Sequence, residues 1–391
     1  MHRMQPLIIF ALLAASAHAF SSSSKVLFRE HVASSSHASF SEMAAHHDSN
    51  VDDSFDKKVS SRREVIKKTA AASTFMLPLI SQALPVYAND EASTSYFTEE
   101  KPNLDCLLNL PPITPGCVRI YLCRHGQTEN NRLRLVQGAR VNPSINGTGR
   151  KQAIRLGEAL SRLKQSRVEN LEFPKLGLHS TLLRAQETAE AASLMIGRGT
   201  YDEDANYDYV RKYFDTPTLP FMEVERDTLK LMSEPSLAEI DFGSIDGKDV
   251  KEAKKEMMST FGKWAIGQID ASNGGGEDGR SVLQRVAKAL FVLRQYASDT
   301  TGSVVAVTHS AYLRVLLCLV QGLPFLAAKT IEQKNCCINV IDVSMKEVVT
   351  ITNKSSVFGG LLSQAPADFR LQIPKAYVIR QNEISHLEGL L

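Results

Sequence analysis

From residue 118 onward, short apolar runs alternate with longer stretches in which apolar residues recur at helical spacing. The short runs are rich in β-branched residues, which is typical of buried strands. We predict strands over 118–123, 175–179, 304–308 and 338–343. We predict helices over 150–163, 181–195, 281–297 and 312–321. Strands and helices that alternate in this way predict an α/β fold with a mostly parallel sheet.

Two of the predicted strands end beside a histidine. Arg124 and His125 follow the first strand, and His309 follows the third. Because ligands in an open α/β sheet bind at the carboxyl ends of the strands, we expect both histidines at one edge. Arg124 can donate paired hydrogen bonds to an anion, and Gly126 allows a ligand to approach closely. Taken alone, Arg124 and His125 also fit a loop that faces solvent.

Two further residues fit an anion site. Arg184 lies in the first turn of the predicted helix 181–195, where free N–H groups and the helix dipole favour anions. Glu239 lies between apolar residues, and burial there would raise its pKa and suit a general acid. The alternatives are a surface arginine and a capping or surface acid.

Three regions lack a clear period. Residues 127–147 predict a loop, and residues 198–235 predict an irregular segment over the sheet that acts as a lid or selects the substrate. Residues beyond 343, with Pro366 and Pro374, predict a polar tail.

Composition narrows the class of protein. The 391 residues are 43% hydrophobic and 23% charged, as in a soluble globular chain. A net charge of +2 offers no argument for nucleic acid, and no stretch predicts a permanent membrane span. The six cysteines lack metal-site spacing, although Cys106 and Cys117 flank a Pro-rich connector and could pair in an oxidising compartment.

The first part of the chain predicts a series of targeting segments. Met1 to Ala19 has the basic start, apolar stretch and small-residue end of a signal peptide. The junction at Phe20 resembles the start of a transit peptide in proteins sent to complex algal plastids. Arg62 and Arg63 before an apolar stretch resemble a twin-arginine signal, and a basic turn before a buried helix is the alternative. These features predict the thylakoid lumen, with the plastid stroma as the alternative.

The corresponding boundaries divide the chain into six parts. These are a signal peptide (1–19), a plastid transit segment (20–60), a twin-arginine segment (61–88), a linker (89–117), one catalytic domain (118–343) and its C-terminal extension (344–391).

A set of motifs, in order along the chain, resembles one family. Arg124-His125-Gly126-Gln127-Thr128 with Asn131 is similar to the R-H-G-x-T-x-x-N signature of the histidine phosphatase superfamily, phosphoglycerate mutase-like branch. Later matches to its motifs are Gln137-Gly138, Ser180-x-Leu182-x-Arg184-Ala185, Glu239 with Gly243 and Gly247, Gly276-Glu277, and Thr308-His309-Ser310.

This resemblance implies a three-layer α/β/α sandwich and a phosphohistidine mechanism without metal or cofactor. It assigns the nucleophile to His125 and the general acid to Glu239. It assigns substrate binding to Arg124, Arg184, His309, Asn131, Gln137 and Gly138. The implied substrate is a small phosphorylated metabolite, and the oligomeric state stays open.

The reaction that follows phosphoenzyme formation is less sharply indicated. Mutases of the family carry Glu, Ser and Trp where this chain has Gln127, Thr128 and Asn130, which favours a phosphatase. Asp278 and Ser310 also depart from the family pattern and affect substrate contacts. A mutase, a protein phosphatase and a non-catalytic phosphate-binding module remain as alternatives.

Overall fold

The computed structural model describes residues 101–165, 173–198, 203–215, 229–353 and 365–391. The predicted targeting segments at 1–19, 20–60 and 61–88 lie outside these residues, as does the first part of the predicted linker. Within the described part of the chain, no helix is both long enough and apolar enough to cross a membrane.

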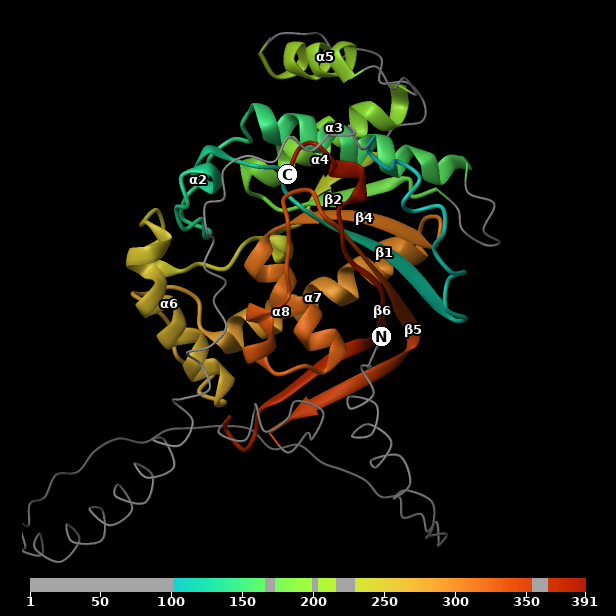
Figure 1. Ribbon diagram of the computed structural model, residues 1–391. Helices are drawn as coiled ribbons and strands as arrows, with labels where there is room; N and C mark the ends of the chain where they lie inside the picture. The colour runs from blue at the N-terminus through green and yellow to red at the C-terminus, as the bar shows by residue number, and fades with distance from the viewer. Residues whose placement is uncertain (1–100, 166–172, 199–202, 216–228, 354–364) are drawn as a thin grey trace, which may run out of the picture. The chain divides into compact units, whose positions relative to one another are not determined.

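A six-stranded sheet forms the centre of the fold, in the order β3-β2-β4-β1-β5-β6 (Figure 1). The strands are β1 (Cys117–Arg124), β2 (Leu176–His179), β3 (Lys230–Ser233), β4 (Ser303–Thr308), β5 (Ile338–Thr352) and β6 (Arg370–Glu383). The first four strands in this order run parallel, and β5 and β6 pair antiparallel. The carboxyl ends of β2, β4 and β1 therefore lie side by side at one end of the sheet.

Helices cover both faces of the sheet, because the buried strands are apolar on both sides. In β1, Tyr121 and Cys123 pack toward α3 (Gly147–Arg162) and α4 (Leu183–Arg198). The alternate residues Ile120 and Leu122 pack toward α7 (Gly279–Ser298) and α8 (Ser310–Gln321) on the opposite face (Figure 1). The predicted three-layer α/β/α architecture is confirmed.

Two predicted irregular regions contain regular elements. The segment 198–235 includes α5 (Glu203–Asp215), which packs Val210 into the core, and β3, which at four residues is too short to show a period. The predicted loop 127–147 includes α2 (Glu129–Arg132), whose first turn is held by side-chain hydrogen bonds between Thr128 and Asn131.

The predicted polar tail is wrong. Beyond residue 343, β5 continues to Thr352, and Arg370–Glu383 forms β6 along the edge of the sheet. Pro374 lies within β6, where an edge strand can tolerate the missing N–H. The interpretation failed because a proline inside a run of residues normally argues against a strand.

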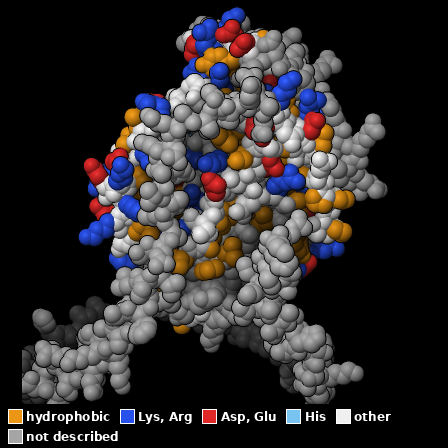
Figure 2. All heavy atoms as spheres, viewed as in Figure 1, with side chains coloured by type: hydrophobic (Ala, Val, Ile, Leu, Met, Phe, Trp, Pro, Cys, Tyr) orange, Lys and Arg blue, Asp and Glu red, His pale blue; other side chains and the backbone are white. Residues whose placement is uncertain are grey.

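Residues 101–116 pack against the same domain. Cys106, Leu107 and Leu110 are buried in the core that α3 and α4 cover. All six cysteines are free, so the suggested disulfide between Cys106 and Cys117 is not formed. On the face of the molecule in Figure 2, Lys and Arg side chains are interspersed with Asp and Glu over the described surface.

Candidate active site

The two histidines that the sequence predicts for the site lie close together at the carboxyl ends of the parallel strands. His125 follows β1 and His309 follows β4, and these strands pair directly. Their ring centroids lie 5.2 Å apart. Both side chains are buried, with 3% of His125 and 0% of His309 exposed. Two adjacent strands therefore deliver two imidazoles to one enclosed place.

The ring of His125 is held in one tautomer. Its Nδ1 lies 2.7 Å from the carbonyl oxygen of Gly126. A carbonyl only accepts, so Nδ1 carries the proton and Nε2 keeps its lone pair. Residue 126 packs so tightly against Gly149 that only a glycine fits. A Cβ at residue 126 would lie 2.6 Å from the Gly149 carbonyl oxygen.

Two arginines stand beside these rings without a carboxylate of their own. The Nη1 of Arg124 donates to the Gln333 carbonyl at 2.7 Å, while its buried Nε has no partner. Arg184 is fully buried and donates to the carbonyls of Val141 and Gly138, at 2.9 and 3.2 Å. Its Nε is also buried without a partner. Buried cationic donors without a counterion suit an incoming anion.

These charges act on both histidines. Burial lowers the pKa of His125 well below its usual 6.5, and the neighbouring Arg184 and Arg124 lower it further. Burial and Arg184 likewise lower the pKa of His309. The Nε2 of His309 lies 2.7 Å from the Ser180 hydroxyl, and its Nδ1 has no partner. Both rings are therefore neutral near pH 7. We call Arg124, His125, Arg184 and His309 the cage.

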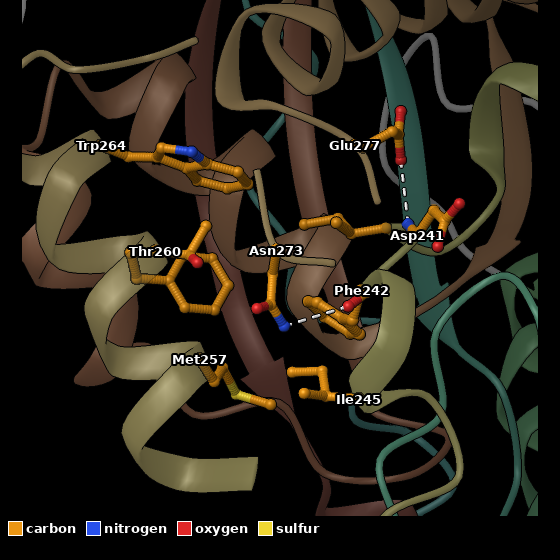
Figure 3. A pocket seen from close by; sticks show the side chains of 10 residues that line it. Asp241, Phe242, Ile245, Met257, Thr260, Trp264, Asn273 and Glu277 are labelled. Atoms are coloured by element: carbon orange, nitrogen blue, oxygen red, sulfur yellow. Dashed lines mark hydrogen bonds between the residues drawn. The ribbon is translucent and has the colours of Figure 1, made fainter. Parts of the chain in front are cut away.

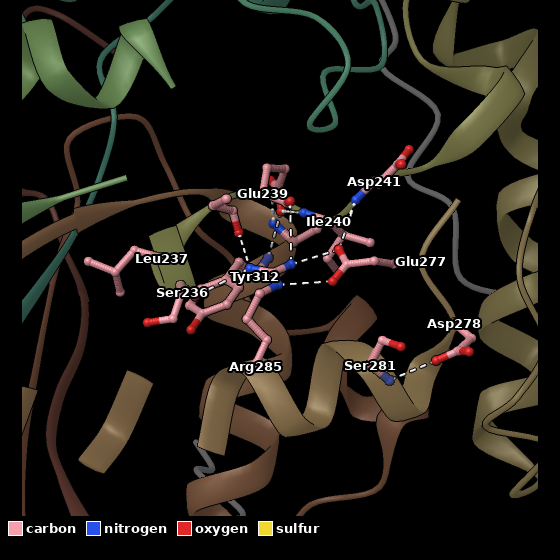
Figure 4. Close-up of polar contacts among 12 residues, drawn as sticks. Ser236, Leu237, Glu239, Ile240, Asp241, Glu277, Asp278, Ser281, Arg285 and Tyr312 are labelled. Carbon is pink, nitrogen blue, oxygen red and sulfur yellow. Dashed lines mark hydrogen bonds and ion pairs between the residues drawn. The ribbon is translucent and has the colours of Figure 1, made fainter. Parts of the chain in front are cut away.

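The Glu239 carboxylate lies beside Tyr312, in the first turn of α8 (Figure 4), and its charge acts on Arg184 of the cage. Its Oε1 accepts from the N–H groups of Ile240 and Tyr312, each at 2.9 Å, and its Oε2 accepts from Ala311 at 3.2 Å. Burial raises the pKa of Glu239, while these N–H groups and Arg184 oppose that rise. A carboxyl group with a raised pKa can hold a proton for a leaving group.

The other three predicted substrate-binding residues contact the walls of the site. Asn131 and Gln137 both hydrogen-bond Thr128, whose hydroxyl donates to Gln137 Oε1 at 2.7 Å. Gly138 supplies a carbonyl to Arg184 and donates its N–H to Asp246. Their observed contacts position Thr128 and Arg184.

The sequence interpretation missed several residues that hold the cage. The carbonyl oxygen of His125 accepts from Asn335 Nδ2 at 3.0 Å and from the Cys336 N–H at 3.3 Å. Gln333 anchors Arg124 from the same segment, just before β5. These contacts use backbone groups or a single amide, so no residue pattern marks them. Arg314 in α8 adds another buried Nε without a partner.

A small cavity lies beside the stretch 236–242, which carries Glu239 and which we call the acid loop. Phe242 of this loop faces Met257 and Trp264 of α6 (Val250–Ala265) across the cavity (Figure 3). Its lining includes none of the cage residues. Among the described residues, no group of three or more His, Cys, Asp or Glu side chains is arranged to hold a metal ion.

Comparisons with known proteins identify the family of this chain. The sequence matches the family model of the "Histidine phosphatase superfamily (branch 1)" over residues 120–205 and 221–353, more than half of the chain. A "Probable phosphoglycerate mutase GpmB" of Salmonella typhi is 24% identical over 225 residues, which cover 58% of this chain and 85% of the relative. "Phosphoserine phosphatase 1" of Hydrogenobacter thermophilus is 27% identical over 206 residues, which cover 52% and 77%.

Among solved structures, the chain is similar to a phosphoserine phosphatase from Entamoeba histolytica in complex with 3-phosphoglyceric acid. It is 17% identical, and the match covers 69% of this chain and 98% of that structure, with a TM-score of 0.44. The extent of the family match, together with the motifs that contain all four cage residues, settles the family. The chain belongs to the histidine phosphatase superfamily, branch 1.

Proposed function

We propose that this protein is a phosphatase that hydrolyses a small phosphomonoester through a phosphohistidine on His125. One observation carries this proposal: the lone pair of His125 Nε2 belongs to a buried ring beside two arginines whose buried Nε atoms have no hydrogen-bond partner. Phosphoryl transfer depends mainly on positioning and charge stabilisation, and such a cage provides both.

In the first step, Nε2 of His125 attacks phosphorus and the bond from phosphorus to the ester oxygen breaks. Arg124, Arg184 and His309 donate to the phosphoryl oxygens. Glu239 gives its proton to the departing oxygen, so the product leaves as a neutral alcohol. The bond between Nδ1 and Gly126 keeps the phosphorylated ring in place.

In the second step, water attacks the phosphohistidine. The Glu239 carboxylate takes a proton from this water, the bond from nitrogen to phosphorus breaks, and inorganic phosphate leaves. His125 returns to its neutral form and Glu239 is again protonated. The protein is unchanged after one cycle, which consumes the phosphomonoester and one water molecule. The carboxyl group of Glu239 serves as the acid in the first step and as the base in the second.

A mutase is the second candidate, because a relative named as a phosphoglycerate mutase matches most of its own length to this chain. Phosphatase chemistry is favoured by the residues after the nucleophile. Gln127 accepts from the Asn146 side chain, and Thr128 caps the N-terminus of α2, at the two positions where mutases of the family carry Glu and Ser. These residues make contacts within the wall of the site.

The test is trapping of the phosphoenzyme. The protein is incubated with a labelled phosphomonoester panel of sugar phosphates, phosphoglycerates and phosphopeptides, then quenched in alkali, which preserves phosphohistidine. We expect label on His125 and release of inorganic phosphate from a small metabolite. His125→Ala should lose both by a factor of about 10⁴ or more while it remains folded. Label transferred to a second metabolite would indicate a mutase. Preferred turnover of the phosphopeptides would indicate a protein phosphatase, and no label at all a phosphate-binding module.

A further inference from the structure

Arg285, in α7, reaches from the helix to the backbone of the acid loop. Its Nη1 donates to the carbonyl of Ala238 at 2.5 Å and to that of Ser236 at 3.3 Å. Its Nη2 lies 3.4 Å from the carbonyl oxygen of Glu239 itself. One guanidinium therefore binds three backbone carbonyls of the acid loop, and the last of these belongs to the proposed general acid, Glu239 (Figure 4).

Glu277 completes this arrangement just before α7 begins. It forms a two-point ion pair with Arg285, with Nε to Oε1 at 2.9 Å and Nη2 to Oε2 at 2.7 Å. Its Oε2 also accepts from the Asp241 N–H at 3.1 Å, and its own N–H donates to the Asp241 carbonyl at 2.8 Å. The loop is thus held on both sides of Glu239.

The same arginine touches the element that binds the Glu239 carboxylate. The Arg285 guanidinium lies 5.1 Å from the centre of the Tyr312 ring, and the Tyr312 N–H donates to Glu239 Oε1. The side chains of Arg285 and Glu277 are 18% and 22% exposed, so solvent screens the ion pair only in part. Arg285 therefore binds the Glu239 backbone directly and contacts the Glu239 carboxylate only through Tyr312.

We propose that the pair of Arg285 and Glu277 positions Glu239 for proton transfer. This inference rests on the proposed phosphatase function. Among the described residues, Arg285 hydrogen-bonds the acid loop and Glu277 and no cage residue, so it positions Glu239 through the acid loop and Tyr312. Its charge also helps to lower the pKa of His309, and Arg285→Lys keeps that charge. Proton transfer requires the acid within hydrogen-bond reach of the leaving oxygen, and a displacement of about 1 Å can cost about 10²-fold in rate.

The experiment separates the proton-transfer step from attack by His125. Single-turnover phosphoenzyme formation is measured with an alkyl phosphate, whose leaving group needs a proton, and with an activated aryl phosphate, whose leaving group does not. The variants are Arg285→Lys, which keeps the charge but loses the planar fork, and Glu277→Gln. We expect both to slow the alkyl phosphate by about 10- to 100-fold and the aryl phosphate by less than about threefold.

The matched control is Arg280→Lys in the same helix. Arg280 also forms an ion pair, with Nε 2.6 Å from Asp270 Oδ1, but its side chain makes no hydrogen bond to the acid loop. This variant should behave as the wild type with both substrates. In a Glu239→Gln background, Arg285→Lys should add no further loss, because the residue through which it acts is already disabled.

Equal losses on the two substrates, no loss on either, or an additive loss in the Glu239→Gln background would overturn the positioning role. So would unfolding of both Arg285→Lys and Glu277→Gln in circular dichroism, since the pair would then serve the fold. Failure of the wild type to form a phosphoenzyme would instead overturn the proposed function, and this inference with it.

Discussion

The two ends of β1 each carry an arginine, and the two side chains have opposite surroundings. Arg119, near the start, is fully buried and faces Asp342, its direct partner on β5. Its Nε and Nη2 lie 2.8 and 3.0 Å from the two carboxylate oxygens, and the carbonyl of Pro111 accepts from Nη1. Arg124, at the end, has one carbonyl partner and a buried Nε without any.

The difference separates a structural cation from a binding cation. Asp342 compensates the charge of Arg119 and also accepts from Thr114, which joins the segment before β1 to the sheet. Burial lowers the pKa of Arg124, and Cys337 and Glu239 oppose this shift only in part. A buried donor that the fold leaves unpaired is stabilised when an anion arrives. The same residue type thus serves the fold at one end of the strand and the ligand at the other.

The largest expected effect concerns the structural end. Arg119→Met should lower the free energy of unfolding by about 3–5 kcal/mol, because Asp342 would be left as an unpaired buried charge. The measurement is urea unfolding followed by circular dichroism. Turnover per folded molecule should stay close to that of the wild type. A variant as stable as the wild type would show that the ion pair contributes nothing net.

At the other end, Arg124→Met should lower the rate of phosphoenzyme formation by about 10²- to 10³-fold, equivalent to about 2.7–4 kcal/mol. Stability without ligand should change little, since the charge that is removed has no carboxylate partner. Inorganic phosphate should raise the melting temperature of the wild type and of Arg119→Met, but raise that of Arg124→Met much less. If phosphate protects Arg124→Met as strongly as the wild type, Arg124 does not face the anion.

The pH dependence of phosphoenzyme formation should also distinguish Arg124 from Arg119. The pKa of His125 is lowered, so its neutral, attacking form persists below pH 6.5 and is lost only as pH falls through the lowered value. Arg124→Met removes one cause of this shift and should move the acid limb of single-turnover phosphoenzyme formation to higher pH. Arg119→Met should leave that limb in place.

The same profile also reports on Glu239. Its pKa is raised, so the protonated form persists above its usual value, and activity on alkyl phosphates should fall as pH rises through the raised value. The two shifts widen the range in which a neutral His125 and a protonated Glu239 coexist. An acid limb that does not move in Arg124→Met would mean that burial and Arg184, without Arg124, lower the pKa of His125.

The cage could be predicted from the sequence because its residues stand at positions that local rules identify. His125 and His309 follow apolar runs that read as parallel strands, and Arg184 lies at a helix start. Parallel pairing then brings the strand ends together without any knowledge of the loops. The location of the cage follows from a sheet topology that the alternation of strands and helices already indicates.

The residues that support the cage could not be found in this way. In the sequence, Arg119 only interrupts an apolar run, and the strand register is what places Asp342 opposite it. Arg285 looked like any arginine on a predicted helix, because its partners are backbone carbonyls of a loop 46 to 49 residues away. Such roles depend on three-dimensional contacts between distant segments, which composition and period do not encode. The edge strand β6 was missed for a related reason, since its pairing with β5 outweighs the local signal of Pro374.

The smallest expected effect concerns Arg314, which is less deeply buried than either Arg119 or Arg124. It is only partly buried, yet its Nε is buried without a partner, and Glu239 and Glu332 oppose the lowering of its pKa by burial. Its positive charge should strengthen binding of any phosphate dianion through the electric field in the site, but solvent screens this charge more than that of Arg184.

Arg314→Met should therefore raise KM about fivefold, equivalent to about 1 kcal/mol, with little change in kcat. At about 1 M salt, where the Debye length is about 3 Å, this difference should largely vanish, whereas the loss in Arg124→Met should persist. Steady-state kinetics at low and high salt provide the measurement. A loss in Arg314→Met that resists salt and falls on kcat would place Arg314 within the cage itself.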